Sequence, residues 1–571
     1  MPVMVKHQTE TGCDTESPIR PGDLVVVVII TLVASALCLY DLDGKCLWGD
    51  EMNMVWFATG ERDLQLSSGN ALGYLPVLRL ISEASPTDFA FRLPAAICSI
   101  LTVPMLFWAA TLLFDRRVGV VAALFLAVNP FQLAHAQQVH SYAAFSLLAL
   151  ASFVLMWFGY QRNRWPYWIA FAVVSGINMH LHLFTVFVLM TEAVILVTWL
   201  AFDRRLFDSP TRRTMVVSAV VASIILTISA PLIRDWIWPL GTQLVTKLSG
   251  DVPEHRPLRS TPAFEITPAL YNRAFREMVV WKAPFREIPK LMLLVTVTGL
   301  LVGWQRSRRS TATVLLWLLV PLVPITLFSR ASAIDFGTRR LLFLLPYLAV
   351  LIAVGVTSIG DFLGRAISRL RRNVRPGWLP TAVAALFVLA PIAWATSYYY
   401  SYLENVDTRA AARLLEMEAK PGDLVFAWRP DHYRYYINQE IHVEDVTSIR
   451  KVLREAEYAP RIWYFRPHNV ASWKRFDPVE QMLSDAGAAR IHLGGDLILS
   501  FATREPSGAA GDLAERLSLL EAMLTLKPDR HYVHRQLANG YRAAGQERQA
   551  AEHLARAEEL TYTDPFSRGS R

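Results

Sequence analysis

Long apolar blocks alternate with short polar segments from Leu24 to Tyr400. Each block is about 17–22 residues long, which as an α-helix crosses a hydrocarbon core about 30 Å thick. Because lipid offers no hydrogen-bond partners, a backbone inside it must satisfy its own amides, so the blocks should be helices. The pattern predicts about 11 transmembrane helices, near residues 24–40, 93–114, 118–134, 142–160, 166–181, 183–202, 215–233, 287–304, 313–329, 341–359 and 378–400. The stretch 166–202 fits either two helices that turn at Asn178–His182 or one long tilted helix.

The pattern changes after Tyr402, where charged residues become frequent. Thr408–Lys420 has helical spacing and ends at Pro421-Gly422, and three short apolar runs read as strands: Leu424–Trp428, Arg461–Phe465 and Leu497–Phe501. Helices that alternate with such strands indicate a small α/β domain. A Ser-Gly-Ala-Ala-Gly linker at 507–511 should separate this domain from the C-terminal segment.

The last segment has the spacing of about one and a half tetratricopeptide repeats. Leu537-Ala538, Tyr541, Ala550, Leu554 and Ala557 carry this spacing, and Pro528 falls where a preceding repeat would end. An ordinary helical hairpin is the alternative interpretation. The predicted fold is therefore an all-α polytopic membrane bundle, then an α/β domain, then a helical segment. The expected divisions are 1–23 (N-terminal, cytoplasmic), 24–400 (membrane), 401–506 (α/β) and 512–562 (tetratricopeptide-like).

Charge gives the bundle a direction. Of 571 residues 53% are hydrophobic and 19% charged, with a net charge of +8. The excess of Lys and Arg collects in alternate short loops, which marks cytoplasmic loops rather than nucleic-acid binding. These loops contain Arg116-Arg117, Arg162 and Arg164, Arg204-Arg205, Arg308-Arg309 and Arg371-Arg372. The N-terminus is then cytoplasmic, and the C-terminal domain lies on the outer side.

The polar residues that could carry chemistry lie at the outer ends of the spans. Trp48-Gly49-Asp50-Glu51 places two adjacent carboxylates just after the first span, where they are either partnered or simply the start of a solvated loop. The run from His135 to Tyr142 holds two histidines, two amides and a tyrosine at a turn. Arg339-Arg340, after Asp335, can clamp a phosphate or snorkel to the surface. His180 and His182 could share a metal only on extended backbone, and no ligand set stands out.

In this order and spacing, the motifs resemble the GT-C glycosyltransferases, in particular the bacterial branch similar to protein O-mannosyltransferases and Rgt-like lipopolysaccharide core transferases. The resemblance spans residues 24–360. The family's outer Asp-Glu pair corresponds to Asp50-Glu51, and its Arg-x-Pro pattern to Arg92-Leu93-Pro94. Its Ser-Gln-Glu-x-Arg-x-Tyr type motif corresponds to residues 136–142, with Gln138 for the glutamate and His140 for the arginine. His182 and Arg339-Arg340-Leu341 match later family positions.

This resemblance implies transfer of a sugar from a polyprenyl-phosphate donor to an acceptor hydroxyl on the outer face of the plasma membrane. Asp50 would be the general base, with Glu51 orienting it or binding the acceptor. Arg339 and Arg340 would hold the donor phosphate, and Arg92 is expected among the donor-binding residues. The donor pocket would be lined by Gln137, His140, Tyr142 and His182. The acceptor could be a lipid, a glycan or a protein, and some relatives use a divalent metal. Membrane lipids surround the bundle, and a protein partner could bind the tetratricopeptide-like tail.

Two other functions fit parts of the sequence. A lipid-linked sugar transporter or flippase would cross the same membrane, but such proteins tend to show inverted repeats and helices broken near the midplane. An assembly protein could use the bundle as an anchor and the tail to recruit partners, which leaves the Asp-Glu loop unexplained.

Overall fold

A computed structural model describes residues 21–62, 73–202, 220, 224, 234, 267–330, 337–370, 377–402, 406–437, 441–446, 449–456, 459–467, 477–485, 488–494, 497–503 and 508–562. The chain forms two compact units. The membrane unit comprises Met1–Leu42 and Asn53–Tyr402, and the α/β unit comprises Asp43–Met52 and Leu403–Arg571. The loop before and including Asp50-Glu51 therefore packs with the C-terminal residues. Several sequence features lie outside the described residues: positions 1–20, Arg204-Arg205, most of the expected span 215–233, Asp335 and Arg371-Arg372.

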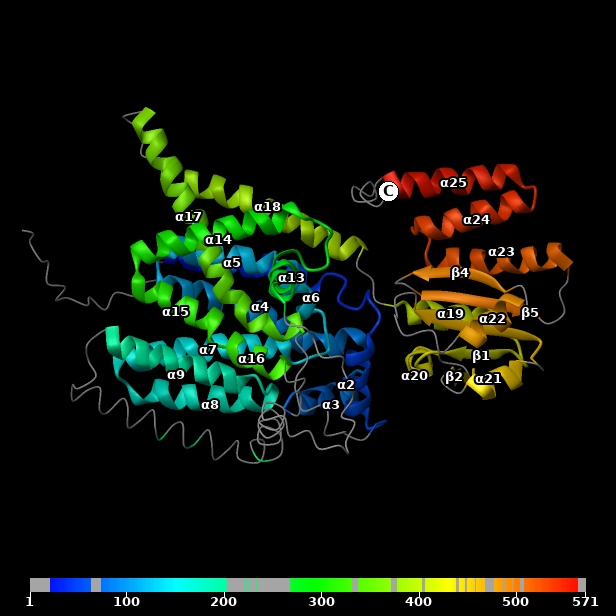
Figure 1. Ribbon diagram of the computed structural model, residues 1–571, viewed down its shortest axis with the longest axis horizontal. Coiled ribbons are helices and arrows are strands. Elements are labelled where there is room, and N and C mark those ends of the chain that lie inside the picture. Colours follow the sequence, from blue (N-terminus) through cyan, green and yellow to red (C-terminus); the bar gives the residue numbers. More distant parts are fainter. Residues whose placement is uncertain are drawn as a thin grey trace, which may run out of the picture. The chain divides into compact units, whose positions relative to one another are not determined.

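The membrane unit is a helical bundle (Figure 1). Its helices in the described segments are α1 (Pro21–Leu39), α2 (Gly49–Thr59, shared with the α/β unit), α3 (Leu75–Ala84), α4 (Asp88–Leu113), α5 (Arg116–Ala127), α6 (Pro130–Ala136), α7 (Tyr142–Arg162), α8 (Trp165–Leu181), α9 (Thr185–Phe202), α13 (Pro268–Val280), α14 (Glu287–Arg306), α15 (Arg308–Leu319), α16 (Leu322–Arg330), η3 (Thr338–Leu344), α17 (Leu345–Leu370) and α18 (Leu379–Tyr402).

The chain crosses a membrane several times. Within the described ranges, 8 helices are long and apolar enough to span, or 9 if the bent pair α5–α6 counts as one span. The predicted number of about 11 was for the whole chain and includes the span 215–233, most of which lies outside the described residues. The expected helix at 166–181 exists as α8, but with 17 residues it is shorter than the spans that qualify. The expected turn at Asn178–His182 is confirmed, because α8 ends at Leu181 and α9 starts at Thr185.

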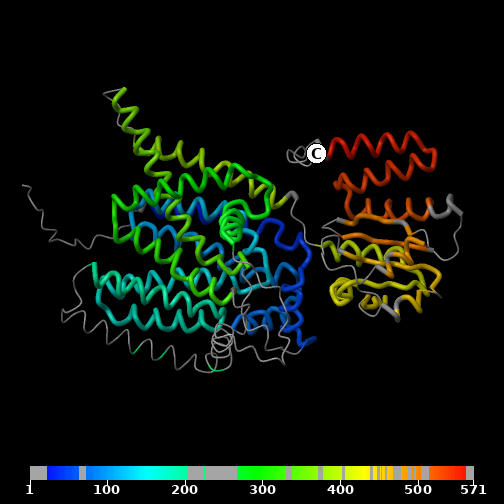
Figure 2. Tube along the Cα trace, in the orientation of Figure 1, coloured from blue at the N-terminus to red at the C-terminus, as the bar shows by residue number. Residues whose placement is uncertain are grey.

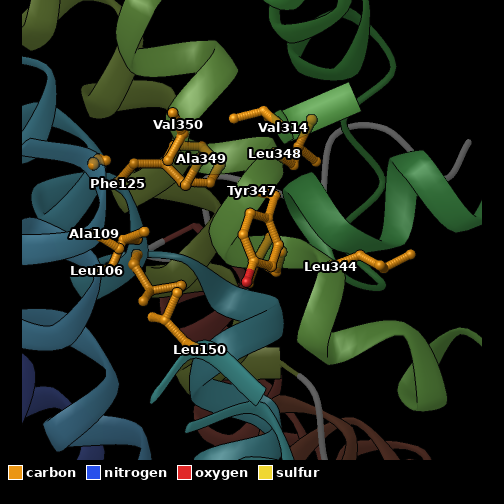
Figure 3. Close-up of a cluster of buried hydrophobic side chains, with 14 of the residues drawn as sticks. Leu106, Ala109, Phe125, Leu150, Val314, Leu344, Tyr347, Leu348, Ala349 and Val350 are labelled. Atoms are coloured by element: carbon orange, nitrogen blue, oxygen red, sulfur yellow. The ribbon is translucent and has the colours of Figure 1, made fainter. Parts of the chain in front are cut away.

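Helix α17 forms the centre of the bundle, where it packs against α5, α14 and α18. Its first residues are buried on every side, and the Tyr347 ring stacks on Trp317 with centroids 4.3 Å apart. Figure 3 shows Tyr347 among aliphatic side chains that include Leu106, Leu150 and Leu344. A helix that is apolar all round is expected where neighbours cover every face.

Ion pairs link residues of two predicted basic loops to α1 and α17. Asp361 of α17 pairs with Arg117 at 2.7 Å and with Arg306 at 2.5 Å, and Asp23 pairs with Arg116. The helix η3, which carries Arg339 and Arg340, directly precedes α17. Both arginines therefore lie toward the N-terminal end of α17, away from Asp361. The predicted alternation of basic loops on one face is consistent with this arrangement.

The α/β unit is a three-layer sandwich (Figure 2). Its strands are β1 (Leu424–Ala427), β2 (Val443–Asp445), β3 (Arg461–Pro467), β4 (Ala489–Gly494) and β5 (Leu497–Thr503), in the order β2-β1-β3-β5-β4. Strands β2, β1 and β3 are parallel, whereas β5 is antiparallel to β3 and β4. Its helices are α19 (Thr408–Glu418), α20 (Pro430–Arg434), α21 (Ile449–Ala456), α22 (Asp477–Asp485), α23 (Gly508–Leu526), α24 (His531–Ala543) and α25 (Glu547–Tyr562).

Alternation along the strands decides which helices cover each face. Val425 and Trp463 point into the layer of α19, α23 and α24, whereas Phe426 and Tyr464 point toward α21 and α22. The three predicted strands are confirmed, and β2 and β4 were missed because both are short and carry polar residues. The predicted linker at 507–511 was wrong: α23 begins at Gly508, since its later turns bury Leu520 and Met523 against the sheet.

Candidate active site

A sharp turn between α6 and α7 brings together most of the polar residues predicted for the donor site. Asn129 caps α6 by accepting hydrogen bonds from the amides of Phe131 (2.9 Å) and Gln132 (3.0 Å), and its own amide donates to Met278 O (3.0 Å). Such a side-chain cap fixes where a helix starts. Pro130 at the first helical position reinforces it, which sets α6 at 58° to α5. The chain then turns back into α7 at Tyr142.

Aromatic rings from three segments pack around this turn. The His140 ring stacks on Tyr142 with centroids 3.8 Å apart, and the His182 ring lies 5.6 Å from Tyr142. Phe145, one turn further along α7, stacks on His182 at 4.7 Å. All four side chains are buried. His140, Tyr142 and His182 are thus brought together as predicted from their common face.

Hydrogen bonds fix the tautomer of His182. Its Nδ1 accepts a hydrogen bond from the amide of Phe184 at 3.1 Å, so a neutral ring must carry its proton on Nε2. This Nε2 is buried and has no hydrogen-bond partner within the described chain. A buried N–H without an acceptor is costly, and an anionic ligand oxygen would relieve that cost.

Two arginines act electrostatically on these histidines from η3. Burial lowers the pKa of His182 to about 3, and the charge of Arg340 lowers it further in the same direction. Burial also holds the pKa of His140 well below its usual range, with added repulsion from His182 and from Arg339. Both rings are therefore neutral near pH 7, and the positive charge of the cluster resides on the arginines. Neutral N–H donors beside guanidinium groups form a site that suits an anion.

Two predicted pocket residues have structural partners instead. The Gln137 amide donates to Tyr40 O (2.8 Å) and Cys38 O (3.2 Å) and accepts from the Tyr399 hydroxyl (2.9 Å), so it ties α1 to α18. Arg92 is buried and donates to Leu42 O at 2.9 Å. Their roles toward a ligand stay predictions.

The carboxylate pair starts α2, in the α/β unit. Glu51 is fully buried and its Oε2 accepts a hydrogen bond from the amide of Trp48 at 3.1 Å, which is the reaching-back half of a capping box. Asp50 is half-buried. The helix start therefore uses Glu51, and the role of Asp50 as the general base stays a prediction.

Sequence reasoning missed residues on the α13–α14 connection. Trp281 packs on His135 with centroids 5.2 Å apart, and Lys282 lies 5.4 Å from the Trp281 ring. An aromatic–cation pair at the end of a predicted outer loop could have suggested this contact. Among the described residues, no group of three His, Cys, Asp or Glu side chains could hold a metal ion. The backbone carbonyl of His180 accepts a hydrogen bond from the Gly73 amide at 2.9 Å.

Comparisons with known proteins bear on this arrangement. Residues 77–234, which carry the α6–α7 turn and His182, match the family model of dolichyl-phosphate-mannose-protein mannosyltransferases. Over these residues the chain is similar to membrane glycosyltransferases of the GT-C type. The predicted family resemblance is thereby confirmed. No curated protein sequence matches the chain.

Solved structures show a similar fold. ArnT from Cupriavidus metallidurans bound to undecaprenyl phosphate superposes with a TM-score of 0.51 at 14% identity, covering 86% of this chain and 100% of that one. Its apo form gives 0.51 at 14% identity, over 85% and 99%. The oligosaccharyltransferase of Archaeoglobus fulgidus in the apo form gives 0.46 at 12% identity, over 77% and 69%.

Proposed function

We propose that this glycosyltransferase moves a sugar from a polyprenyl-phosphate donor to an acceptor hydroxyl on the outer face of the plasma membrane. The observation that carries the proposal is the buried cluster of His140, Tyr142 and His182 under the charge of Arg339 and Arg340. The name of the matched family includes a dolichyl-phosphate sugar, and ArnT of the same fold was crystallised with undecaprenyl phosphate. A lipid-linked phosphate is an anion of the kind this cluster suits.

The donor phosphate would sit against the arginines and the Nε2–H of His182. As the bond from the sugar to the phosphate breaks, the phosphate gains negative charge. Fixed cationic donors that already point at this charge lower the barrier without rearrangement. Tyr142 and His140 would present ring faces and polar edges to the sugar, while Arg92 and Gln137 would hold the surrounding segments.

The acceptor hydroxyl needs one base, because the departing phosphate is already a fair leaving group. Asp50 would take the hydroxyl proton, and Glu51 would keep α2 in place beside it through its bond to Trp48. The class of acceptor, whether lipid, glycan or protein, stays open in this proposal. With the basic loops in the cytoplasm, the N-terminus lies inside and the α/β unit outside.

The test is transfer by the purified full chain in lipid nanodiscs, with undecaprenyl-phosphate sugars as donors and with envelope glycolipids, glycans and proteins as acceptors. Asp50→Asn should abolish product, whereas Asp43→Asn, an exposed carboxylate in the same loop, should act like the wild type. Arg340→Ala should raise the donor KM by about 10–100-fold, because a charge-assisted hydrogen bond contributes binding free energy of that size. Arg308→Ala, an exposed arginine before α15, is its control.

The result also separates an enzyme from a transporter. A flippase would move the intact lipid-linked sugar and release no polyprenyl phosphate. Full transfer by Asp50→Asn would remove Asp50 from the mechanism, and an unchanged donor KM in Arg340→Ala would remove the phosphate role of that residue.

A further inference from the structure

The loop that carries Asp50 is held by residues far along the chain. The amide of Leu47 donates to the Tyr436 hydroxyl at 3.0 Å, and the Cys46 thiol donates to Asp407 Oδ1 at 3.2 Å. Asp407 also pairs with Lys527 at the end of α23. The segment 46–51 is therefore fixed from one side by the sheet-bearing residues of the α/β unit.

Arg429 makes the closest of these approaches. It follows β1 and precedes α20, and its guanidinium stands 4.6 Å from the ring centroid of Trp428. The same guanidinium lies directly on Gly49: a Cβ at that position would fall within 3.0 Å of Nη1 and 3.2 Å from Cζ. Gly49 is the residue before Asp50, so a permanent cation rests against the backbone that presents the carboxylate. A side chain at Gly49 would have to displace the guanidinium.

The backbone of Arg429 is itself unusual. Its φ of 59° and ψ of 68° are left-handed, a region in which a Cβ clashes with the following carbonyl and which favours glycine. A glycine would form this turn with less strain, so the turn alone does not account for an arginine. Strained non-glycine residues that persist often serve a site.

We propose that Arg429 is a positioning residue for the reaction: through its contact with Gly49 it fixes the Asp50–Glu51 pair, so the C-terminal part of the chain completes the catalytic loop. The inference rests on the role proposed above for Asp50. It assigns a function to the α/β unit.

Arg429→Gly tests this directly, because glycine suits the left-handed backbone and removes only the side chain. We expect kcat to fall between about tenfold and about a hundredfold, the effect of a small misplacement of a catalytic group. The donor KM should stay unchanged, and the melting temperature should not fall. Arg429→Lys should restore part of the rate. A variant Arg429→Gly with wild-type kcat would overturn the proposal.

A double-mutant cycle tests the contact itself. Gly49→Ala should lose activity because its Cβ would displace the guanidinium from the loop. In the Arg429→Gly background that space is open, so the same substitution should cost much less. Equal losses in both backgrounds would show that the two residues do not act on each other, which would overturn the contact on which the proposal depends.

A labelling experiment separates this inference from the proposed reaction. In a chain with Cys13→Ser, Cys38→Ala and Cys98→Ala, buried Cys46 remains as the single thiol and reports whether the loop is held. Arg429→Gly should raise its rate of maleimide labelling, and unchanged labelling would overturn the positioning role. If the wild type transfers no sugar from any polyprenyl-phosphate donor, the proposed function fails, while the labelling result still decides the loop contact.

Discussion

The crossing of α14 and α17 gives a sharp prediction, because two glycines let the helices touch backbone to backbone. A Cβ on Gly355 would lie 2.9 Å from Val295 Cγ1 and still closer to the Val295 carbonyl oxygen. A Cβ on Gly299 would lie 2.9 Å from the Leu351 carbonyl carbon. Membrane helices use such small residues to pack closely, since lipid provides no hydrophobic drive for their association.

Gly355→Ala should therefore destabilise the bundle. Ordinary van der Waals contact needs at least 3.4 Å, so the backbones must separate or bend to admit the methyl group. Overpacking of this kind typically costs about 1–3 kcal/mol. In a helix without such a contact, the same change from Gly to Ala is worth about 1 kcal/mol in the favourable direction. Gly176→Ala in α8 is the matched control, because nothing lies within 4 Å of its Cβ position.

The assay is thermal unfolding of the full chain in nanodiscs, followed by tryptophan fluorescence. Gly355→Ala should melt below the wild type, and Gly176→Ala should melt at or above it. Because α17 follows η3 directly, a displaced α17 should also weaken the donor site, seen as a raised donor KM. Equal melting temperatures for the two variants would refute the argument from close packing.

Other consequences concern the α/β unit and the histidines. Arg461 is almost buried and donates to Asp423 at 2.6 Å and to Glu515 at 3.0 Å. Arg461→Ala should therefore lower the free energy of unfolding of that unit by about 3–5 kcal/mol, whereas Arg548→Ala, at an exposed position, should lower it by about 0.5 kcal/mol. Despite burial, hydrogen bonds from Arg461 hold the pKa of Asp423 below its usual value, so this stabilisation should be complete above about pH 4 and lost as pH falls further, as measured by urea unfolding. With the pKa of His182 near 3, the pH–rate profile of His182→Gln should keep the wild-type shape between about pH 5 and about pH 8; a lost inflection would contradict a neutral ring. Truncation after residue 507 should lower expression and activity, because it removes α23 and the pair of Lys527 with Asp407; full activity would show that the C-terminal helices are dispensable.

The sequence alone determined the membrane character, most of the helices and the three central strands, because these depend on local periodicity. Span length and the period of apolar residues are set by lipid thickness and backbone hydrogen bonding, which act within one segment. The family motifs also placed His140, Tyr142 and His182 on a common face. The sequence did not predict the short strand β2 or the true start of α23, because packing with the sheet rather than local propensity stabilises them.

Contacts between residues that are far apart in the sequence became visible only in the tertiary structure. The sequence could not show that the Gln137 amide donates to the Tyr40 carbonyl, or that Arg92 donates to the Leu42 carbonyl. The tautomer of His182 depends on one amide two residues later. Above all, no local pattern could show that Arg429 rests on Gly49, because 380 positions of chain separate them and only the folded α/β unit closes that distance. Contacts of this kind arise from packing, which a period of 3.6 or 2 does not encode.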